Sequence, residues 1–249
     1  MFEATKKTIR NGLRVLGYDL VKFSATHNQR AYGLIATSAT YCPWNVDAAF
    51  CEIYNAVRHK TLADVYRTYE LWELVEQAAK LPSGALIEVG VWRGGTGALI
   101  AKRAQLCGID APVYLCDTFT GVVKAGGKDS DYHGGEHADA SRDIVEALAA
   151  WMDLPNVRIL QGVFPEQTGA AVADETFRFC HIDVDVYQSA RDIVEWIDSR
   201  MVPGGIYVYD DYGCPGTVGI TRWVDEERKR PDRVVVYNLN AHAVVIKTR

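Results

Sequence analysis

The chain has 249 residues, of which 48% are hydrophobic, and its 27 Lys and Arg against 32 Asp and Glu give a formal net charge of −5. This size and composition suit one large α/β domain with an extension, whereas the slight acidity argues against a nucleic-acid-binding surface, which is usually basic. No run approaches the roughly 20 apolar residues of a membrane span, and no apolar signal segment follows the charged residues 1–10. The six cysteines form no Cys-x-x-Cys pair. We therefore expect a cytoplasmic protein with reduced thiols.

The first eighty residues are expected to form a helical extension. Apolar residues spaced three and four apart predict helices over Phe50–His59 and Leu62–Leu81. The preceding segment, Phe23–Trp44, mixes aromatic and polar residues and could form a cap over a site. We therefore divide the chain into an N-terminal helical or cap extension, residues 1–80, and a main domain, residues 81–249.

From Ala85 onward, short apolar runs alternate with helical stretches. The predicted strands are Ala85–Val89, Val113–Cys116, Val157–Leu160, Arg178–Ile182, Ile206–Tyr209, Val234–Tyr237 and Ala243–Ile246. The predicted helices are Gly94–Cys107, Ser141–Trp151, a short piece at Gln167–Val172, Tyr187–Met201 and Thr217–Lys229. This alternation predicts an α/β fold, a doubly wound, seven-stranded, mostly parallel sheet with helices on both faces and a C-terminal antiparallel hairpin at one edge. In such a sheet the ligand lies beyond the carboxyl ends of the parallel strands.

A glycine-rich loop, E-V-G-V-W-R-G-G-T-G over Glu88–Gly97, follows the first predicted strand. Its glycines allow the backbone to approach a ligand and open a helix with free N–H groups. Trp92 stands where the dinucleotide fingerprint G-x-G-x-x-G has its second glycine, which argues against NAD and favours another adenosine-containing ligand. Asp117 follows the second strand, where an acid commonly receives ribose hydroxyls, although a lone Asp there could also cap a turn.

Four carboxylates follow two strands that should be neighbours. Asp183 and Asp185 come after the fourth strand, and Asp210 and Asp211 after the fifth. If the extended backbone persists, alternation places Asp183 and Asp185 on one side. Crowding four carboxylates is costly without a counter-charge, and carboxylate oxygens suit Mg²⁺, Mn²⁺ or Ca²⁺. Any one of these residues could be a helix cap, but the four together predict a metal site.

Several motifs occur together in order along the chain. They are E-V-G-V-W-R-G-G at Glu88–Gly95, D-T-F-T-G at Asp117–Gly121, D-V-D-V-Y-Q-S at Asp183–Ser189, P-G-G at Pro203–Gly205 and D-D-Y-G at Asp210–Gly213. Together they resemble the macrocin O-methyltransferase family, which methylates sugar hydroxyls of macrolide and aminocoumarin antibiotics. The resemblance covers about Phe50 to the end of the sequence and implies the Rossmann-like class I methyltransferase fold.

The resemblance implies S-adenosylmethionine as cofactor and assigns residues to it by position. The implied cofactor-binding residues are Thr61, Glu88, Val89, Gly90, Val91, Trp92, Asp117, Thr118, Ser141, Val163 and Phe164. Ser141 could equally be an N-cap, and Val163 and Phe164 could equally belong to the core. The resemblance further implies Mg²⁺ or Mn²⁺ held by Asp183, Asp210 and Asp211. Asp185 would be the general base that takes the proton of the acceptor hydroxyl as the methyl group is transferred.

The acceptor is the least constrained part of the interpretation. Val184 stands where antibiotic enzymes of this family often have Gly, His181 is not typical of them, and Lys124–Ala140 is unusually rich in Gly, Asp and His. We expect Gly126–His137 to be a mobile, solvated lid rather than a second metal site. No role is assigned to the remaining histidines, which are His27, His59 and His242.

Other functions remain open from the sequence. A catechol-type or other non-sugar hydroxyl acceptor would need the same dication and a planar aromatic gate, and a non-catalytic protein binding S-adenosylmethionine would need no base beside a metal. The expected partner is a small-molecule hydroxyl acceptor, with no nucleic acid and no membrane. Relatives of this kind often pair through N-terminal elements, which favours a homodimer or higher homo-oligomer.

Overall fold

The computed structural model describes residues 12, 13, 15, 35 and 39–249. Contacts divide the chain after Ser38, and Ala39–Arg249 forms one compact unit. The cap expected at Phe23–Trp44 therefore lies largely outside the described residues. The domain boundary expected between residues 80 and 81 stays a prediction. None of the described helices has both the length and the apolar composition needed to cross a membrane.

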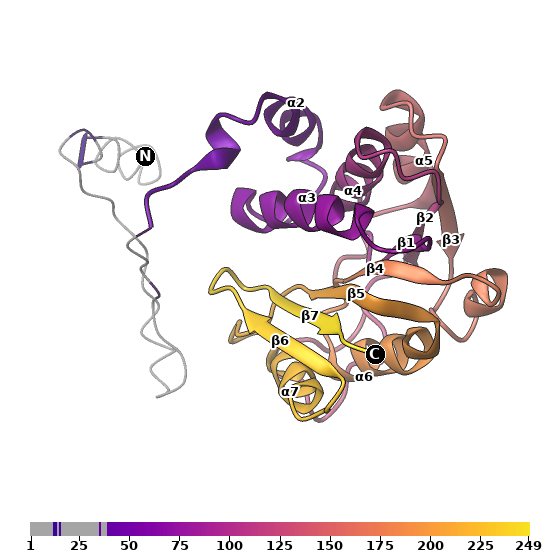
Figure 1. Cartoon of the computed structure of the whole chain (residues 1–249). Helices are drawn as coiled ribbons and strands as arrows, with labels where there is room; N and C mark the ends of the chain where they lie inside the picture. The colour runs from indigo at the N-terminus through magenta and orange to yellow at the C-terminus, as the bar shows by residue number, and fades with distance from the viewer. Residues whose placement is uncertain (1–11, 14, 16–34, 36–38) are drawn as a thin grey trace. The chain divides into compact units, whose positions relative to one another are not determined.

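A seven-stranded sheet confirms the predicted fold class (Figure 1). Its strands are β1 (Ala85–Val89), β2 (Val113–Asp117), β3 (Val157–Gln161), β4 (Phe177–Ile182), β5 (Met201–Tyr209), β6 (Arg233–Tyr237) and β7 (Ala243–Lys247). Their order is β3-β2-β1-β4-β5-β7-β6, and the first five are parallel. β7 lies antiparallel between β5 and β6, so the expected C-terminal hairpin forms the edge.

Helices cover both faces of the sheet. One apolar core joins the sheet to α2 (Ala48–Val57), α3 (Val65–Ala79), α4 (Gly95–Leu106) and α5 (Arg142–Trp151). The other core joins it to α6 (Tyr187–Ile197) and α7 (Val218–Glu227), which lie on the opposite side in Figure 1. Within the described residues the 3-10 helices are η2 (Pro43–Asn45), η3 (Gly169–Val172) and η4 (Asp198–Arg200).

Local chemistry explains where the elements differ from the predicted ranges. The helix expected from Leu62 begins at Val65 because the Asp64 carboxylate caps it, accepting from the backbone N–H groups of Tyr66 and Arg67. Strand β5 begins at Met201, well before the expected Ile206. Its first half contains Pro-Gly-Gly and a register shift against β4, so it lacks the apolar pattern that marks a strand.

The strand order reverses between β1 and β4, which places a crevice beyond their carboxyl ends. Gly90, the first residue after β1, has φ +88°, and a Cβ there would lie 1.7 Å from the Asp183 carbonyl oxygen. The Asp183 backbone N–H in turn donates to the Val89 carbonyl at 2.9 Å. A glycine is therefore required where the two strand ends meet, and the contact fixes Asp183 beside the glycine-rich loop.

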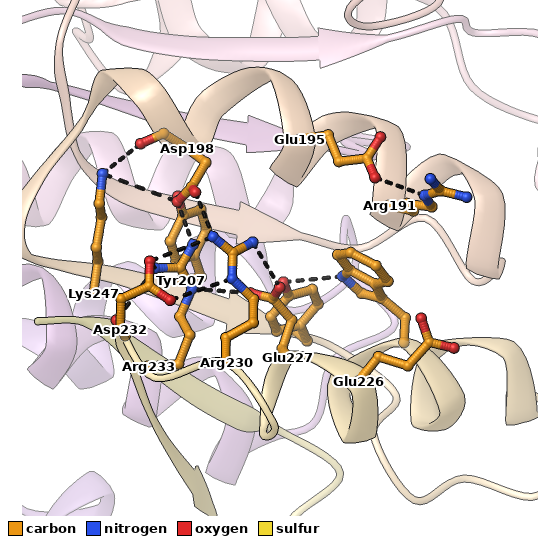
Figure 2. A network of polar contacts seen from close by, with 12 residues as sticks. Arg191, Glu195, Asp198, Tyr207, Glu226, Glu227, Arg230, Asp232, Arg233 and Lys247 are labelled. Carbon is orange, nitrogen blue, oxygen red and sulfur yellow. Dashed lines mark hydrogen bonds and ion pairs between the residues drawn. The ribbon is translucent and has the colours of Figure 1, made fainter. Parts of the chain in front are cut away.

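A network of charges ties the hairpin to the rest of the sheet (Figure 2). Asp198 of η4 accepts from Arg230 at 2.6 Å and also pairs with Arg233 of β6. Arg233, whose side chain is fully buried, pairs with the equally buried Glu227 of α7 at 3.1 Å. Lys247 of β7 donates to the Met201 carbonyl of β5 at 3.0 Å. These bonds hold α7, β6 and β7 in a fixed position against β5.

Candidate active site

A cavity of about 250 Å³ opens at the carboxyl ends of the parallel strands. It is lined by all the residues expected for cofactor, metal and base except Glu88 and Ser141. Those in its wall are Thr61, Val89, Gly90, Val91, Trp92, Asp117, Thr118, Val163, Phe164, Asp183, Asp185, Asp210 and Asp211. The cavity therefore joins the glycine-rich loop at one end to the carboxylates at the other.

Asp117 organises the glycine-rich loop. Its Oδ2 accepts from the backbone N–H groups of Val91 at 2.6 Å and Trp92 at 2.8 Å, and its Oδ1 accepts from Phe119 at 2.7 Å. A carboxylate has about four lone-pair sites. One site on Oδ1 is therefore left for a hydroxyl in the cavity. The Trp92 indole donates to Asp139 at 2.7 Å, which fixes the outer side of the loop.

Two expected cofactor residues lie elsewhere. Glu88 is fully buried, and its Oε1 lies 2.8 Å from His181 Nδ1. Ser141 caps α5 by accepting from the Ile144 N–H, which is the alternative role allowed for it. Phe164 is buried with its ring packed edge-on against Trp196, so it belongs to the core and also to the cavity wall.

Three of the four carboxylates converge. One oxygen from each of Asp183, Asp185 and Asp211 lies within 4.8 Å of the others. The convergence does not come from strand alternation, because β4 ends at Ile182 and the backbone does not stay extended. Asp185 and Asp211 each have φ 64°, in the left-handed region that non-glycine residues rarely adopt. Backbone strain of this kind is typical of functional sites.

The charges of these carboxylates are poorly compensated. Burial, together with the charges of Asp210 and Asp185, raises the pKa of Asp211 to about 8. Burial, Asp210 and Asp185 likewise raise the pKa of Asp183 well above its usual range. Oxygen donors that repel one another in a buried site fit a hard dication such as Mg²⁺ or Mn²⁺.

Asp210 has a different environment from the other three acids. Arg67 of α3 donates to both of its oxygens, and His242 Nε2 lies 3.3 Å from its Oδ1. Burial opposes ionisation, but His242 and Arg67 outweigh it and hold the pKa of Asp210 well below its usual range. Asp210 therefore stays ionised and is positioned by cations, while its neighbours gather around the cavity.

Three residues of the site were missed from the sequence. Arg67 lies in helix α3 and His242 just before β7, both far from the motifs, and His242 was assigned no role. Tyr132 lines the cavity, and its hydroxyl lies 3.2 Å from His137 Nε2. Burial and the charge of Asp185 raise the pKa of Tyr132, so the hydroxyl stays protonated near that carboxylate. An aromatic residue inside a polar segment was the only available signal for it.

The segment expected as a mobile lid is anchored on both sides of the cavity. Asp129 accepts from the Tyr187 N–H at the start of α6, at 2.9 Å. Ser130 donates to the Gly216 carbonyl at 2.8 Å, before α7. Lys128 lies over the Tyr187 ring, 3.4 Å from its centroid. Most of the segment is exposed, as expected for a solvated loop, but these bonds bring Tyr132 and His137 to the cavity wall.

Comparison with known proteins identifies a family whose members resemble this chain. The model of the macrocin-O-methyltransferase (TylF) family matches residues 59–234. The chain is 30% identical over 187 residues to the mycinamicin III 3''-O-methyltransferase of Micromonospora griseorubida, an alignment that covers 66% of this chain and 69% of that protein.

It is also 29% identical over 139 residues to the 8-demethyl-8-(2,3-dimethoxy-alpha-L-rhamnosyl)-tetracenomycin-C 4'-O-methyltransferase of Streptomyces olivaceus, covering 52% of this chain and about half, 53%, of that protein. In fold it is similar to the solved structure of the O-methyltransferase NovP. The TM-score is 0.65 at 24% identity, covering 76% of this chain and 83% of that one.

Proposed function

The chain belongs to the macrocin O-methyltransferase family, and on that premise we propose that it transfers the methyl group of S-adenosylmethionine to a sugar hydroxyl of a glycosylated natural product, with Mg²⁺ or Mn²⁺ as a required ion. The observation that carries this proposal is that one cavity joins the glycine-rich loop to the carboxylate cluster. The tetracenomycin relative is named for a rhamnosyl compound, which supports a sugar as the acceptor.

The loop end of the cavity is the proposed cofactor site. Asp117 would accept a ribose hydroxyl through its remaining lone pair, while Thr61, Val163 and Phe164 would form the walls around the cofactor. The methyl sulfonium of the cofactor is already electrophilic, so the main task of the protein is to hold the acceptor oxygen in line with it.

The carboxylate end is the proposed acceptor site. Asp183, Asp210 and Asp211 would hold the ion, which when bound would lower the pKa of the acceptor hydroxyl. Asp185 would accept the hydroxyl proton on a carboxylate oxygen, and burial raises its pKa and so makes it a stronger base. Tyr132 would orient Asp185 and help to exclude water from this end of the cavity.

The test is a calorimetric titration of S-adenosylmethionine into the metal-free full chain, repeated with Mg²⁺ and with Asp183→Ala. We expect cofactor binding, and a separate Mg²⁺ heat that disappears in the variant. A screen of glycosides for S-adenosylhomocysteine release then identifies the acceptor class. Absence of cofactor binding under every condition would refute the methyltransferase proposal, and turnover that survives chelation of divalent ions would refute the metal requirement.

A further inference from the structure

A second cluster of candidate ligands lies deeper than the acids of the cavity. It consists of His181 near the end of β4, Asp210 after β5 and His242 before β7. One ligand atom from each lies within 4.8 Å of the others. Both histidines are 0% exposed and Asp210 is 4% exposed. Three neighbouring strand ends thus bring two imidazoles and a carboxylate to one buried point.

Each imidazole is oriented by its own carboxylate. His181 Nδ1 lies 2.8 Å from Glu88 Oε1, and His242 Nδ1 lies 2.6 Å from Glu70 Oε2. Glu70 is fixed in turn by Asn240, which donates to it at 3.1 Å. A carboxylate on one ring nitrogen, with the other nitrogen left free, is the usual arrangement of a metal-binding histidine.

The free nitrogens are unsatisfied. Within the described part of the chain, neither His181 Nε2 nor His242 Nε2 has a hydrogen-bond partner. His242 Nε2 approaches Asp210 Oδ1 at 3.3 Å, in a contact that lacks hydrogen-bond geometry. The two ring centroids are 5.9 Å apart. Buried polar atoms without partners are rare in native proteins and call for an explanation.

The surrounding charges point in the same direction. Three buried or partly buried carboxylates, those of Glu70, Glu88 and Asp210, face a single guanidinium, that of Arg67. This leaves two negative charges. Without a metal, burial opposes protonation of His242, but Asp210 and Glu70 outweigh it and raise the pKa of His242 to about 9, so a proton on His242 balances one of the two charges, whereas a bound dication would replace that proton and balance both. Asp210 Oδ1 accepts from Arg67 and from the Asp211 backbone N–H, whereas Oδ2 accepts from Arg67 alone and keeps one lone pair for a ligand bond.

We propose that His181 Nε2, His242 Nε2 and Asp210 form a buried site for a divalent transition metal. Imidazole nitrogens favour Zn²⁺, Co²⁺ or Fe²⁺, whereas the carboxylate oxygens of the cavity favour Mg²⁺. The two sites therefore differ in ligand chemistry, and they share Asp210, whose one free lone pair on Oδ2 can bind one ion at a time. The competing arrangement is a pair of imidazolium ions in the same space, which would balance the charge with protons and would exclude a metal.

The test uses Co²⁺ as the probe, with Mg²⁺ in excess and with neither cofactor nor acceptor present. Equilibrium dialysis measures the bound Co²⁺ per chain, and visible absorption reports nitrogen ligation. We expect one Co²⁺ that excess Mg²⁺ does not displace, and a loss of affinity of at least a hundredfold in His181→Gln and in His242→Gln. His59→Gln removes an exposed imidazole and is the matched control. Equal binding by all three variants, or no Co²⁺ bound by the natural chain, would overturn the proposal.

A second measurement needs no substitution and guards against variants that fail to fold. X-ray absorption on the Co²⁺-loaded natural chain should show scattering from two imidazole rings. A first shell of oxygen alone would assign the metal to the cavity and overturn the buried site. Because cofactor and acceptor are absent, either result is independent of the methyltransferase proposal, which is tested separately by cofactor binding.

Discussion

Arg67 Nη1 lies 2.6 Å from Asp210 Oδ1 and 2.7 Å from Asp210 Oδ2, so a single nitrogen of α3 contacts both oxygens of an acid at the end of β5. The Asp210 side chain is 4% exposed and that of Arg67 is 14% exposed. One turn further along α3, Glu70 contacts His242. Helix α3 therefore stabilises the floor of the cavity through two charged contacts.

Replacing this cation should destabilise the fold and the site together. Arg67→Met leaves Asp210 buried with His242 as its remaining cationic partner, and we expect a loss of about 3 kcal/mol, at the lower end for a broken buried pair because Arg67 is partly exposed. Denaturant unfolding measures the loss. Arg58→Met, at an exposed arginine after α2, is the control. Equal stability of the two variants would contradict a structural role for the Arg67 contact.

Gly90→Ala should abolish cofactor binding. The new Cβ would meet the Asp183 carbonyl oxygen at 1.7 Å, so the loop and the strand end must separate. Gly108→Ala is the matched control, because Gly108 also has positive φ, +68°, but nothing lies within 4 Å of its Cβ position. We expect the control to lose about 1–2 kcal/mol of stability from backbone strain alone and to retain its affinity for S-adenosylmethionine in a calorimetric titration. Unchanged binding by Gly90→Ala would contradict the packing described for the crevice.

Asp185→Asn should separate binding from catalysis. The amide keeps the size of the side chain but has no basic oxygen, so we expect S-adenosylmethionine to bind normally while kcat falls by about 10²–10⁴. Single-turnover release of S-adenosylhomocysteine measures the chemical step. Asp143→Asn, on the exposed face of α5, controls for the change in net charge. A kcat within threefold of the natural chain would exclude Asp185 as the base.

Tyr132→Phe removes the hydroxyl that faces Asp185 from the loop. The loss of one hydrogen bond at the acceptor end should raise the KM for the acceptor about tenfold, with the cofactor affinity unchanged because the loop end of the cavity is untouched. The fold should be stable, since the ring and the anchors at Asp129 and Ser130 remain. A rise in the cofactor Kd with no change in acceptor KM would place Tyr132 at the wrong end of the cavity.

Because of the charge network in Figure 2, the free energy of unfolding should decrease at low pH. Burial opposes ionisation of Asp198, but the hydrogen bond from Arg230 and the charge of Arg233 outweigh it and lower the pKa of this carboxyl. Its contribution is therefore fully present above the unfolded value of about 4 and is lost as the pH falls through the lower folded value.

Asp198→Asn should cost about 1–3 kcal/mol at pH 7. The difference from the natural chain should shrink below about pH 3. Urea unfolding at a series of pH values measures both quantities. A constant difference across the acid range would show that the charge of Asp198 does not stabilise the fold.

The sequence predicted the sheet, the glycine-rich loop and the acids because these are local patterns. Each strand has an apolar run, and Asp117 ends β2 while Asp183 and Asp210 directly follow β4 and β5. The contacts that fix them are not local. Arg67 reaches an acid 143 residues away and Glu70 a histidine 172 residues away, and neither pair has any spacing that a sequence pattern could reveal.

The backbone conformation at the site could not be predicted from the sequence pattern either. Alternation along an extended strand was expected to align Asp183 with Asp185, whereas a left-handed residue at Asp185 produces the convergence. Glu88 occupies a position typical of a cofactor contact, but its pairing with His181 holds it in the interior. Residue type and position in the sequence predicted most residues of the site, whereas long-range packing decides which of their side chains reach the cavity.

The position of β7 has a consequence for how the chain folds. β5 pairs with β7, and β6, which is made earlier, lies outside it. Until the hairpin docks, the edge of β5 is open, and its buried run Ile206–Tyr209 presents unpaired backbone groups. His242 also reaches Asp210 only through this docking. Closure of the sheet edge and completion of the buried charge cluster thus depend on the same docking step, and slow docking of the hairpin would expose the chain to strand-to-strand aggregation.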